Sequence, residues 1–290
     1  MLSRKDLTLN AMMILAMLSW GLSWTNAKLV GQYADAPLIM VWRFLIAAFS
    51  IAPILLITKI SFFIEKRDLL LIFSNSLFMV SYNYFYFKGT QVGLAGTGGV
   101  LVTTLNPVLT LLVSSIIYHT KISTKDIFGL TFGIIGGGLI IRIWQQDMNS
   151  LFQSGNLFFI FASISWVCVT IITSYSKERL SFMSYSFWSF SFAFLLSIPL
   201  ALEQNLLSVF EFDWIFWINL LFLSCIAMSF GTSIYFLASS KLGPKQASAY
   251  IFLVPLSAMG FAMIILLEPL QTSTLFGGIL GIYAVYLINK

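Results

Sequence analysis

Residues 7–29 read LTLNAMMILAMLSWGLSWTNAKL, an apolar stretch in which Lys28 is the single charged side chain. About 20 such residues, wound as a helix, are enough to cross the hydrocarbon core of a bilayer. The stretch also contains Ser19-Trp20, a pair that returns later in the chain. Membrane-spanning length and recurrence together lead to the predicted architecture.

The rest of the chain has the same apolar character. Hydrophobic residues make up 59% of it and charged residues 9%, whereas soluble domains carry about 25% charged residues. A water-soluble enzyme and a disordered chain are therefore excluded. Backbone groups in lipid must bond within their own segment, so the spans are predicted to be helices. Ten are predicted, at residues 7–29, 37–58, 69–88, 94–118, 126–144, 155–175, 183–202, 213–237, 246–267 and 273–289.

Lys and Arg are distributed unevenly between the breaks. With the N-terminus placed inside, 12 of the 16 lie on the inner side, 3 lie on the outer side, and Arg43 lies within a span. Because positive loops favour the cytoplasmic side, both termini are predicted to be cytoplasmic. The excess of Lys and Arg is thus explained by membrane orientation, and nucleic acid is not a predicted partner. A multi-pass protein of the bacterial inner (cytoplasmic) membrane fits this pattern.

The two halves of the chain share landmarks. Ser19-Trp20 matches Ser165-Trp166 at an offset of 146 residues, and Trp42-x-Phe44 matches Trp188-x-Phe190 at the same offset. One matching tryptophan pair would mean little, but two pairs at one offset indicate a duplication.

The offset covers five spans, and five is odd, so the second copy must cross the membrane in the opposite sense. The fold class predicted is an all-α integral membrane protein with ten transmembrane helices, built as two inverted five-helix repeats. The first repeat is residues 1–145 and the second is residues 146–290. Many secondary transporters have this architecture, with the substrate bound near the bilayer midplane.

Three motifs carry a family resemblance. They are Trp42-Arg43-Phe44 in the second span, Gly93 at the start of the fourth span followed by Pro107 within it, and Leu266-Leu267-Glu268-Pro269-Leu270 at the end of the ninth span. In this order and spacing the chain resembles the drug/metabolite transporter superfamily, specifically its ten-span EamA family. The resemblance implies proton-coupled or facilitated movement of a small metabolite, often amino-acid export. It also implies a cavity lined by the first, third and fourth helices of each repeat.

Polar and aromatic side chains inside apolar helices are the candidates for substrate contacts, because burying such groups in lipid is costly. Their structural alternatives are an interfacial aromatic belt, hydrogen bonds between helices, and snorkelling of Arg43 to the outer interface. Pro107 is expected to free a backbone carbonyl one turn earlier in its helix. The predicted substrate-binding residues are Trp20, Trp24, Arg43, Asn83, Tyr86, Asn106, Trp166, Thr170, Tyr235 and Tyr250.

This lining predicts a small neutral or zwitterionic substrate, and an amino acid or related metabolite fits. The predicted function is a non-enzymatic secondary transporter that exports such compounds by alternating access. An alternative is an importer of a cofactor or nucleotide-type metabolite, although a single deep cation, Arg43, suits a large anion poorly. A membrane-embedded enzyme and a non-transporting scaffold are remote alternatives.

The predicted partners are the small-molecule substrate and the lipid bilayer. No Asp or Glu lies deep in any span, so a coupled proton has no evident carrier and stays open. The two cysteines, Cys168 and Cys225, form no metal or disulfide pattern, and no cofactor is predicted. Monomer and homodimer are both left open, as are substrate identity and coupling ion.

Overall fold

The computed structural model describes residues 4–119, 121–145, 147, 149, 154–176 and 180–288. Over these ranges the chain is helical and contains no strand. The first half forms α1 (Arg4–Val30), α2 (Ala36–Ile57), α3 (Lys66–Val92), α4 (Ala95–Ile117), α5 (Thr124–Ile141) and η1 (Ile143–Gln145). The second half forms α7 (Asn156–Ser174), α8 (Phe182–Ser197), η2 (Ile198–Ala201), η3 (Ser208–Glu211), α9 (Trp214–Leu221), η4 (Phe222–Thr232), α10 (Ser233–Leu242), α11 (Pro244–Ala249), η5 (Tyr250–Leu253), α12 (Val254–Ile265) and α13 (Thr272–Ile288).

Six helical stretches of the described chain are long and apolar enough to cross a bilayer. Shorter apolar helices form α12 and most of α13. An all-helical fold with candidate membrane spans is thereby confirmed, while the ten-span count and the inverted repeats stay predictions. The six stretches are Ala36–Ile57, Ala95–Ile117, Thr124–Gln145, Asn156–Ser174, Phe182–Ala201 and Trp214–Leu242.

Two of the predicted spans are irregular. The span predicted over 213–237 contains a π-helical stretch, η4, between α9 and α10. The span predicted over 246–267 is divided into α11, the 3-10 turn η5 and α12. Proline accounts for part of this division, because Pro244 and Pro255 lie in the first turns of α11 and α12, where a missing N–H does little harm.

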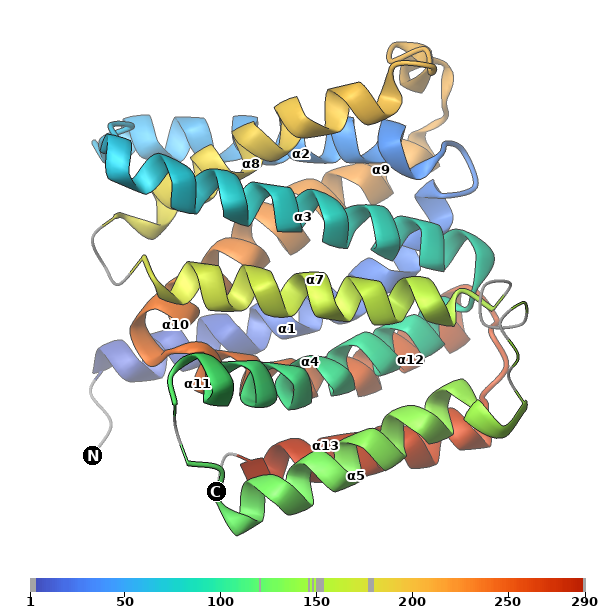
Figure 1. Ribbon diagram of the computed structural model, residues 1–290. Helices are drawn as coiled ribbons and strands as arrows, with labels where there is room; N and C mark the ends of the chain where they lie inside the picture. The colour runs from blue at the N-terminus through green and yellow to red at the C-terminus, as the bar shows by residue number, and fades with distance from the viewer. Residues whose placement is uncertain are drawn as a thin grey trace.

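Helices of one half pack mainly against helices of the other. α3 packs on α7, α2 on α8, α4 on α12, and α1 on η4 and α12. α5 and α13 lie side by side at one edge of the molecule (Figure 1). Glycines allow this close approach: a Cβ on Gly136 would lie 2.7 Å from the carbonyl oxygen of Gly277. The core of the molecule therefore lies between the two halves.

The connections lie at two ends of the helix bundle. α1 begins and α13 ends at one of these, which we call the α1 end, and the connections α2–α3, α4–α5 and α10–α11 lie there too (Figure 1). The connections α1–α2, α3–α4 and α12–α13 lie at the opposite end, which we call the far end (Figure 1). The α1 end holds the basic residues Lys59, Lys66, Lys121, Lys125 and Lys245.

Candidate functional site

A small cavity, here called the central cavity, lies between the two halves. α1 to α4 of the first half line it together with α7, η4 and η5 of the second half. Its volume is about 20 Å³, which is room for roughly one water molecule. The lining residues are Trp20, Ser23, Trp24, Arg43, Tyr82, Asn83, Tyr86, Val102, Thr103, Asn106, Trp166, Met228, Thr232 and Ile251.

Among the described residues of this lining Arg43 carries the only charge, and it is 5% exposed. Its Nη1 donates a hydrogen bond of 2.8 Å to Oδ1 of Asn83. Asn83 is itself oriented by α3, because its Nδ2 donates to the carbonyl oxygen of Met79 at 2.8 Å. The Nε of Arg43 has no hydrogen-bond partner, and among the described residues no carboxylate forms an ion pair with the guanidinium.

Two aromatic rings flank the guanidinium. Cζ of Arg43 lies 5.5 Å from the ring centroid of Tyr86 and 5.4 Å from that of Phe87. Cation–π attraction of this kind offsets part of the desolvation cost of a buried cation. It does not supply the counter-charge that a buried ion ordinarily requires. The side chain is thus fixed in position, while its charge stays uncompensated by the protein.

Aromatic side chains from both halves form much of the cavity wall. Trp20 and Trp166 meet edge to face with ring centroids 5.1 Å apart. The ring centroid of Tyr82 lies 4.7 Å from that of Trp166, and the ring centroid of Trp24 lies 4.6 Å from that of Tyr86. Such a wall can stack on an apolar or aromatic group and can face an ammonium group.

The cavity-facing part of α4 supplies hydrogen-bond acceptors. Asn106 is 3% exposed, and its Oδ1 has no hydrogen-bond partner. Pro107 lacks the N–H that would bond to the carbonyl oxygen of Thr103 one turn earlier. Since Thr103 also lines the cavity, the site combines a donor-rich guanidinium with oxygen acceptors.

The sequence model of the EamA-like transporter family matches residues 8–142 and 153–290. These stretches contain every residue that lines the central cavity. The chain belongs to the EamA-like transporter family. EamA proteins are transporters, so membership and the apolar helices together place the chain in a membrane in a non-enzymatic role.

Individual EamA relatives agree with this assignment. An uncharacterized transporter of Synechocystis is 26% identical over 220 residues, which is 71% of this chain and 66% of the relative, just under two thirds of its length. A probable amino-acid metabolite efflux pump of Salmonella typhimurium is 25% identical over 306 residues, covering 99% of this chain and 95% of the relative. A crystal structure that is 16% identical aligns with a TM-score of 0.67, covering 98% of this chain and 96% of that chain, which shows a shared fold.

The EamA fold brings most of the predicted substrate-binding residues to the central cavity, namely Trp20, Trp24, Arg43, Asn83, Tyr86, Asn106 and Trp166. Thr170 and Tyr235 lie behind this wall, with their hydroxyl oxygens 2.9 Å apart and the Tyr235 ring 5.1 Å from Trp20. Tyr250 lies apart from the cavity, since its hydroxyl donates to Oδ1 of Asn10 in α1.

Seven lining residues are absent from the predicted set: Ser23, Tyr82, Val102, Thr103, Met228, Thr232 and Ile251. A signal existed for Tyr82, which precedes Tyr86 by one helical turn, so that the two rings stack at 5.6 Å. A signal existed for Thr103 as well, because it lies one turn before Pro107 and its carbonyl oxygen is the one that this proline leaves without a helical N–H partner. Val102 and Ile251 are ordinary apolar residues, and nothing in the sequence distinguishes them.

Proposed function

We propose that this EamA protein is a secondary transporter of small metabolites that works by alternating access. In this proposal ten helices span the membrane as two inverted five-helix repeats, residues 1–145 and 146–290. The family model supports the division, because it matches one stretch in each half. The irregular stretches η4 and η5 line the central cavity. They support a transport function, because broken helices are typical of transporter binding sites.

The packing of the helices also supports an inverted repeat. In this register α1 to α5 correspond to α7, α8, α9–α10, α11–α12 and α13. Three of the observed contacts then join equivalent helices, namely α2–α8, α4–α12 and α5–α13. The contact of α3 with α7 has its counterpart in the contact of α1 with η4 and α10. A two-fold relation between the halves generates this set of pairs.

The distribution of charge supports a definite orientation. The connections α2–α3, α4–α5 and α10–α11 lie at the α1 end (Figure 1). In or directly beside these connections the sequence has Lys59, Lys66, Lys121, Lys125 and Lys245. By the positive-inside rule, this end faces the cytoplasm. We therefore propose an inner-membrane protein with both termini cytoplasmic, and we refer to the α1 end as inner and the far end as outer.

The buried, uncompensated charge of Arg43 is the observation that carries the substrate proposal. Removing a guanidinium from water without a counter-charge costs several kcal/mol, of the order of 3–5 kcal/mol where a buried pair is broken. A substrate carboxylate in the central cavity would supply the missing charge and reach the unpartnered Nε. The proposed substrate therefore carries a carboxylate.

The part of the cavity wall that α4 supplies suits a donor group on the same substrate. Oδ1 of Asn106 lacks a partner, and the carbonyl oxygen of Thr103 lacks the N–H that Pro107 cannot provide. An ammonium group next to aromatic rings would satisfy both acceptors. Carboxylate and ammonium on one small molecule describe an amino acid or a close relative.

Export is the proposed direction, supported by the Salmonella relative, which is named as a probable amino-acid metabolite efflux pump. The alternative of importing a cofactor or nucleotide-type metabolite is less well supported, because several phosphate charges would face a single arginine, Arg43. A volume of about 20 Å³ is smaller than any amino acid. Transport therefore requires the walls to separate, and the coupling ion is left open.

The test uses the purified protein and a panel of amino acids with their methyl esters and amides. A ligand that binds the folded state raises the melting temperature by mass action. We expect at least one free acid to stabilise the protein while its ester and amide, which lack the carboxylate charge, do not. In proteoliposomes the same acid should show counterflow.

Arg43→Gln is the decisive variant, and Arg67→Gln is its control because Arg67 is an exposed arginine outside the central cavity lining. Arg43→Gln should abolish the shift produced by the acid, and Arg67→Gln should keep it. Equal stabilisation by acid and ester, or full retention of binding in Arg43→Gln, would overturn the carboxylate proposal.

A further inference from the structure

The far end of the bundle contains a contact in which a charge of one half holds a helix of the other. Glu268, in the connection between α12 and α13, accepts hydrogen bonds from the backbone N–H groups of Ala95 at 2.7 Å and Gly96 at 2.9 Å. These are the first residues of α4, whose N–H groups have no partners within the helix. A carboxylate at this position also interacts favourably with the helix dipole.

The connection that precedes α4 is held from α1 at the same time. Nζ of Lys28 donates to the carbonyl oxygen of Gly93 at 2.8 Å and to that of Gln91 at 3.3 Å. Lys28 thus fixes the carbonyl groups that end α3, while Glu268 fixes the N–H groups that begin α4. The N-terminus of α4 cannot move toward or away from α12 unless the bonds to Glu268 break.

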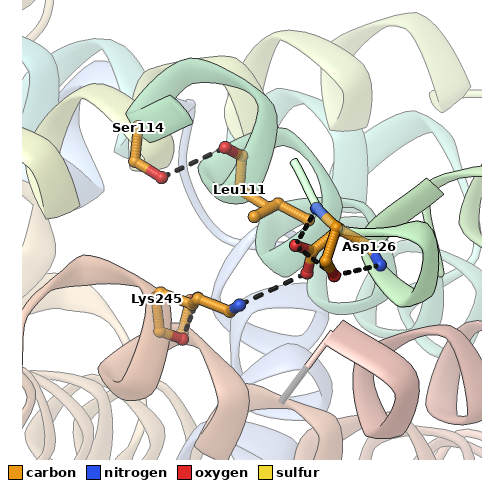
Figure 2. A network of polar contacts seen from close by, with 6 residues as sticks. Leu111, Ser114, Asp126 and Lys245 are labelled. Atoms are coloured by element: carbon orange, nitrogen blue, oxygen red, sulfur yellow. Dashed lines mark hydrogen bonds and ion pairs between the residues drawn. The ribbon is translucent and has the colours of Figure 1, made fainter. Parts of the chain in front are cut away.

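The α1 end contains the counterpart, in which the halves exchange roles (Figure 2). Asp126 in the first turn of α5 forms an ion pair with Lys245 of α11, with Oδ1 and Nζ 3.3 Å apart. Asp126 is 5% exposed and is oriented by Ser123, whose N–H and hydroxyl donate to its Oδ2 at 2.9 and 2.8 Å. The first half therefore presents a fixed carboxylate that holds the start of α11.

Each contact borders a wide pocket, and the central cavity lies between the two. A pocket of about 390 Å³ at the far end is lined by Lys28, Gly93, Leu94 and Thr97 among others. A pocket of about 360 Å³ at the α1 end is lined by Asp126 and Lys245 among others. The molecule thus has a wide pocket at each end and only about 20 Å³ of space at its centre.

We propose that the bonds of Glu268 to α4 and the Asp126–Lys245 pair are the outer and inner latches of transport. Releasing the outer latch frees the start of α4. Further along the same helix, Thr103 and Asn106 line the central cavity. Releasing the inner latch frees α11, which leads into η5 and Ile251 of the same lining. The outer latch must break for the cavity to open at the far end, and the inner latch must break for it to open at the α1 end. The terms outer and inner rest on the proposed function.

Accessibility of a cysteine placed in the central cavity tests the two latches without any substrate. Thr103→Cys is introduced in a background that carries Cys168→Ser and Cys225→Ser. A membrane-impermeant maleimide is then applied to right-side-out and to inverted vesicles. Replacing an ionic hydrogen-bond partner shifts a two-state equilibrium about tenfold. Glu268→Gln should therefore raise the labelling rate about tenfold from outside only, and Asp126→Asn should do so from inside only.

Three further variants keep the result interpretable. Glu211→Gln, an exposed carboxylate near the start of α9, should leave both rates unchanged. Gly96→Ala places a Cβ 3.2 Å from Oε2 of Glu268, so it should displace the latch without removing its charge and raise outside labelling. Exchanging the inner charges, with Asp126→Lys and Lys245→Asp together, should lower the inside rate below that of Asp126→Asn.

The latch proposal fails if Glu268→Gln and Gly96→Ala both leave outside labelling unchanged, or if either raises labelling equally from both sides. The second result would indicate loosened packing. Because no substrate takes part, the carboxylate proposal for Arg43 can fail while the latches stand, and the reverse also holds.

Discussion

Trp20 of α1 and Trp166 of α7 meet edge to face at 5.1 Å in the middle of the molecule, one from each half of the chain. Each tryptophan follows a serine, and the two Ser-Trp pairs lie 146 residues apart in the sequence. Nε1 of Trp20 donates to the carbonyl oxygen of Ala227 at 2.9 Å, which joins α1 to the π-helical stretch η4. The contact therefore connects three elements that would have to separate when the central cavity widens.

Trp20→Phe keeps an aromatic ring but removes the bond to Ala227. We expect the free energy of unfolding to fall by about 1 kcal/mol, the usual net contribution of a hydrogen bond. Ligand affinity should fall together with it, because the ring also lines the cavity. Thermal unfolding with and without ligand measures both effects. Trp214→Phe, at an exposed position, is the control and should change neither quantity.

Asn83→Asp would place a carboxylate where Oδ1 now accepts from Arg43 at 2.8 Å. An internal counter-charge competes with a substrate carboxylate for the same guanidinium. We expect this variant to stay folded and to bind the substrate acid at least tenfold more weakly, as measured by calorimetric titration. Asn83→Leu removes the partner without adding charge, and it should destabilise the protein by about 1–3 kcal/mol. Wild-type affinity in Asn83→Asp would argue that Arg43 has a purely structural role.

Gly136→Ala tests the packing of α5 against α13. The new Cβ would lie 2.7 Å from the carbonyl oxygen of Gly277, closer than two such atoms can approach, so the helices must separate. We expect a loss of about 1–3 kcal/mol in the free energy of unfolding, which is typical of overpacking. Gly138→Ala on the same helix meets its nearest neighbour at 3.8 Å. It should melt like the wild type, and a matching loss there would point to a general intolerance of α5.

The sequence predicted the broad features of this molecule because apolar length and helical spacing are local properties. Trp20 and Trp24 share a helix face by spacing alone, and the structure places both on the cavity. The resemblance to EamA transporters rested on short motifs in order, and the family match agrees with it. Spacing on one helix says nothing about which other helix that face meets, so the pairing of Arg43 with Asn83 was out of reach.

Tyr250 shows a further limit of the sequence. The sequence places Tyr250 five residues before Pro255 in a span predicted to be continuous, yet a 3-10 turn begins at Tyr250 and its hydroxyl reaches Asn10 of α1. The π-helical register of η4 was equally hidden. In it the Ser229 hydroxyl lies within hydrogen-bond distance of two carbonyl oxygens, that of Ser224 five residues earlier and that of Ala47 in α2. The stretch also packs against α1. Tertiary contacts of this kind decide local geometry.

Pro107 gives the sharpest separation between stability and transport. Pro107→Ala restores an N–H, which would bond to the carbonyl oxygen of Thr103 and complete the helical ladder of α4. We expect the protein to be at least as stable as the wild type, because an internal proline is unfavourable in a helix. We also expect weaker substrate binding and slower counterflow, since the cavity loses an acceptor and α4 loses a point of bending. Pro53→Ala in α2, another internal proline outside the cavity lining, is the matched control. If both variants transport equally well, the carbonyl oxygen of Thr103 has no part in binding.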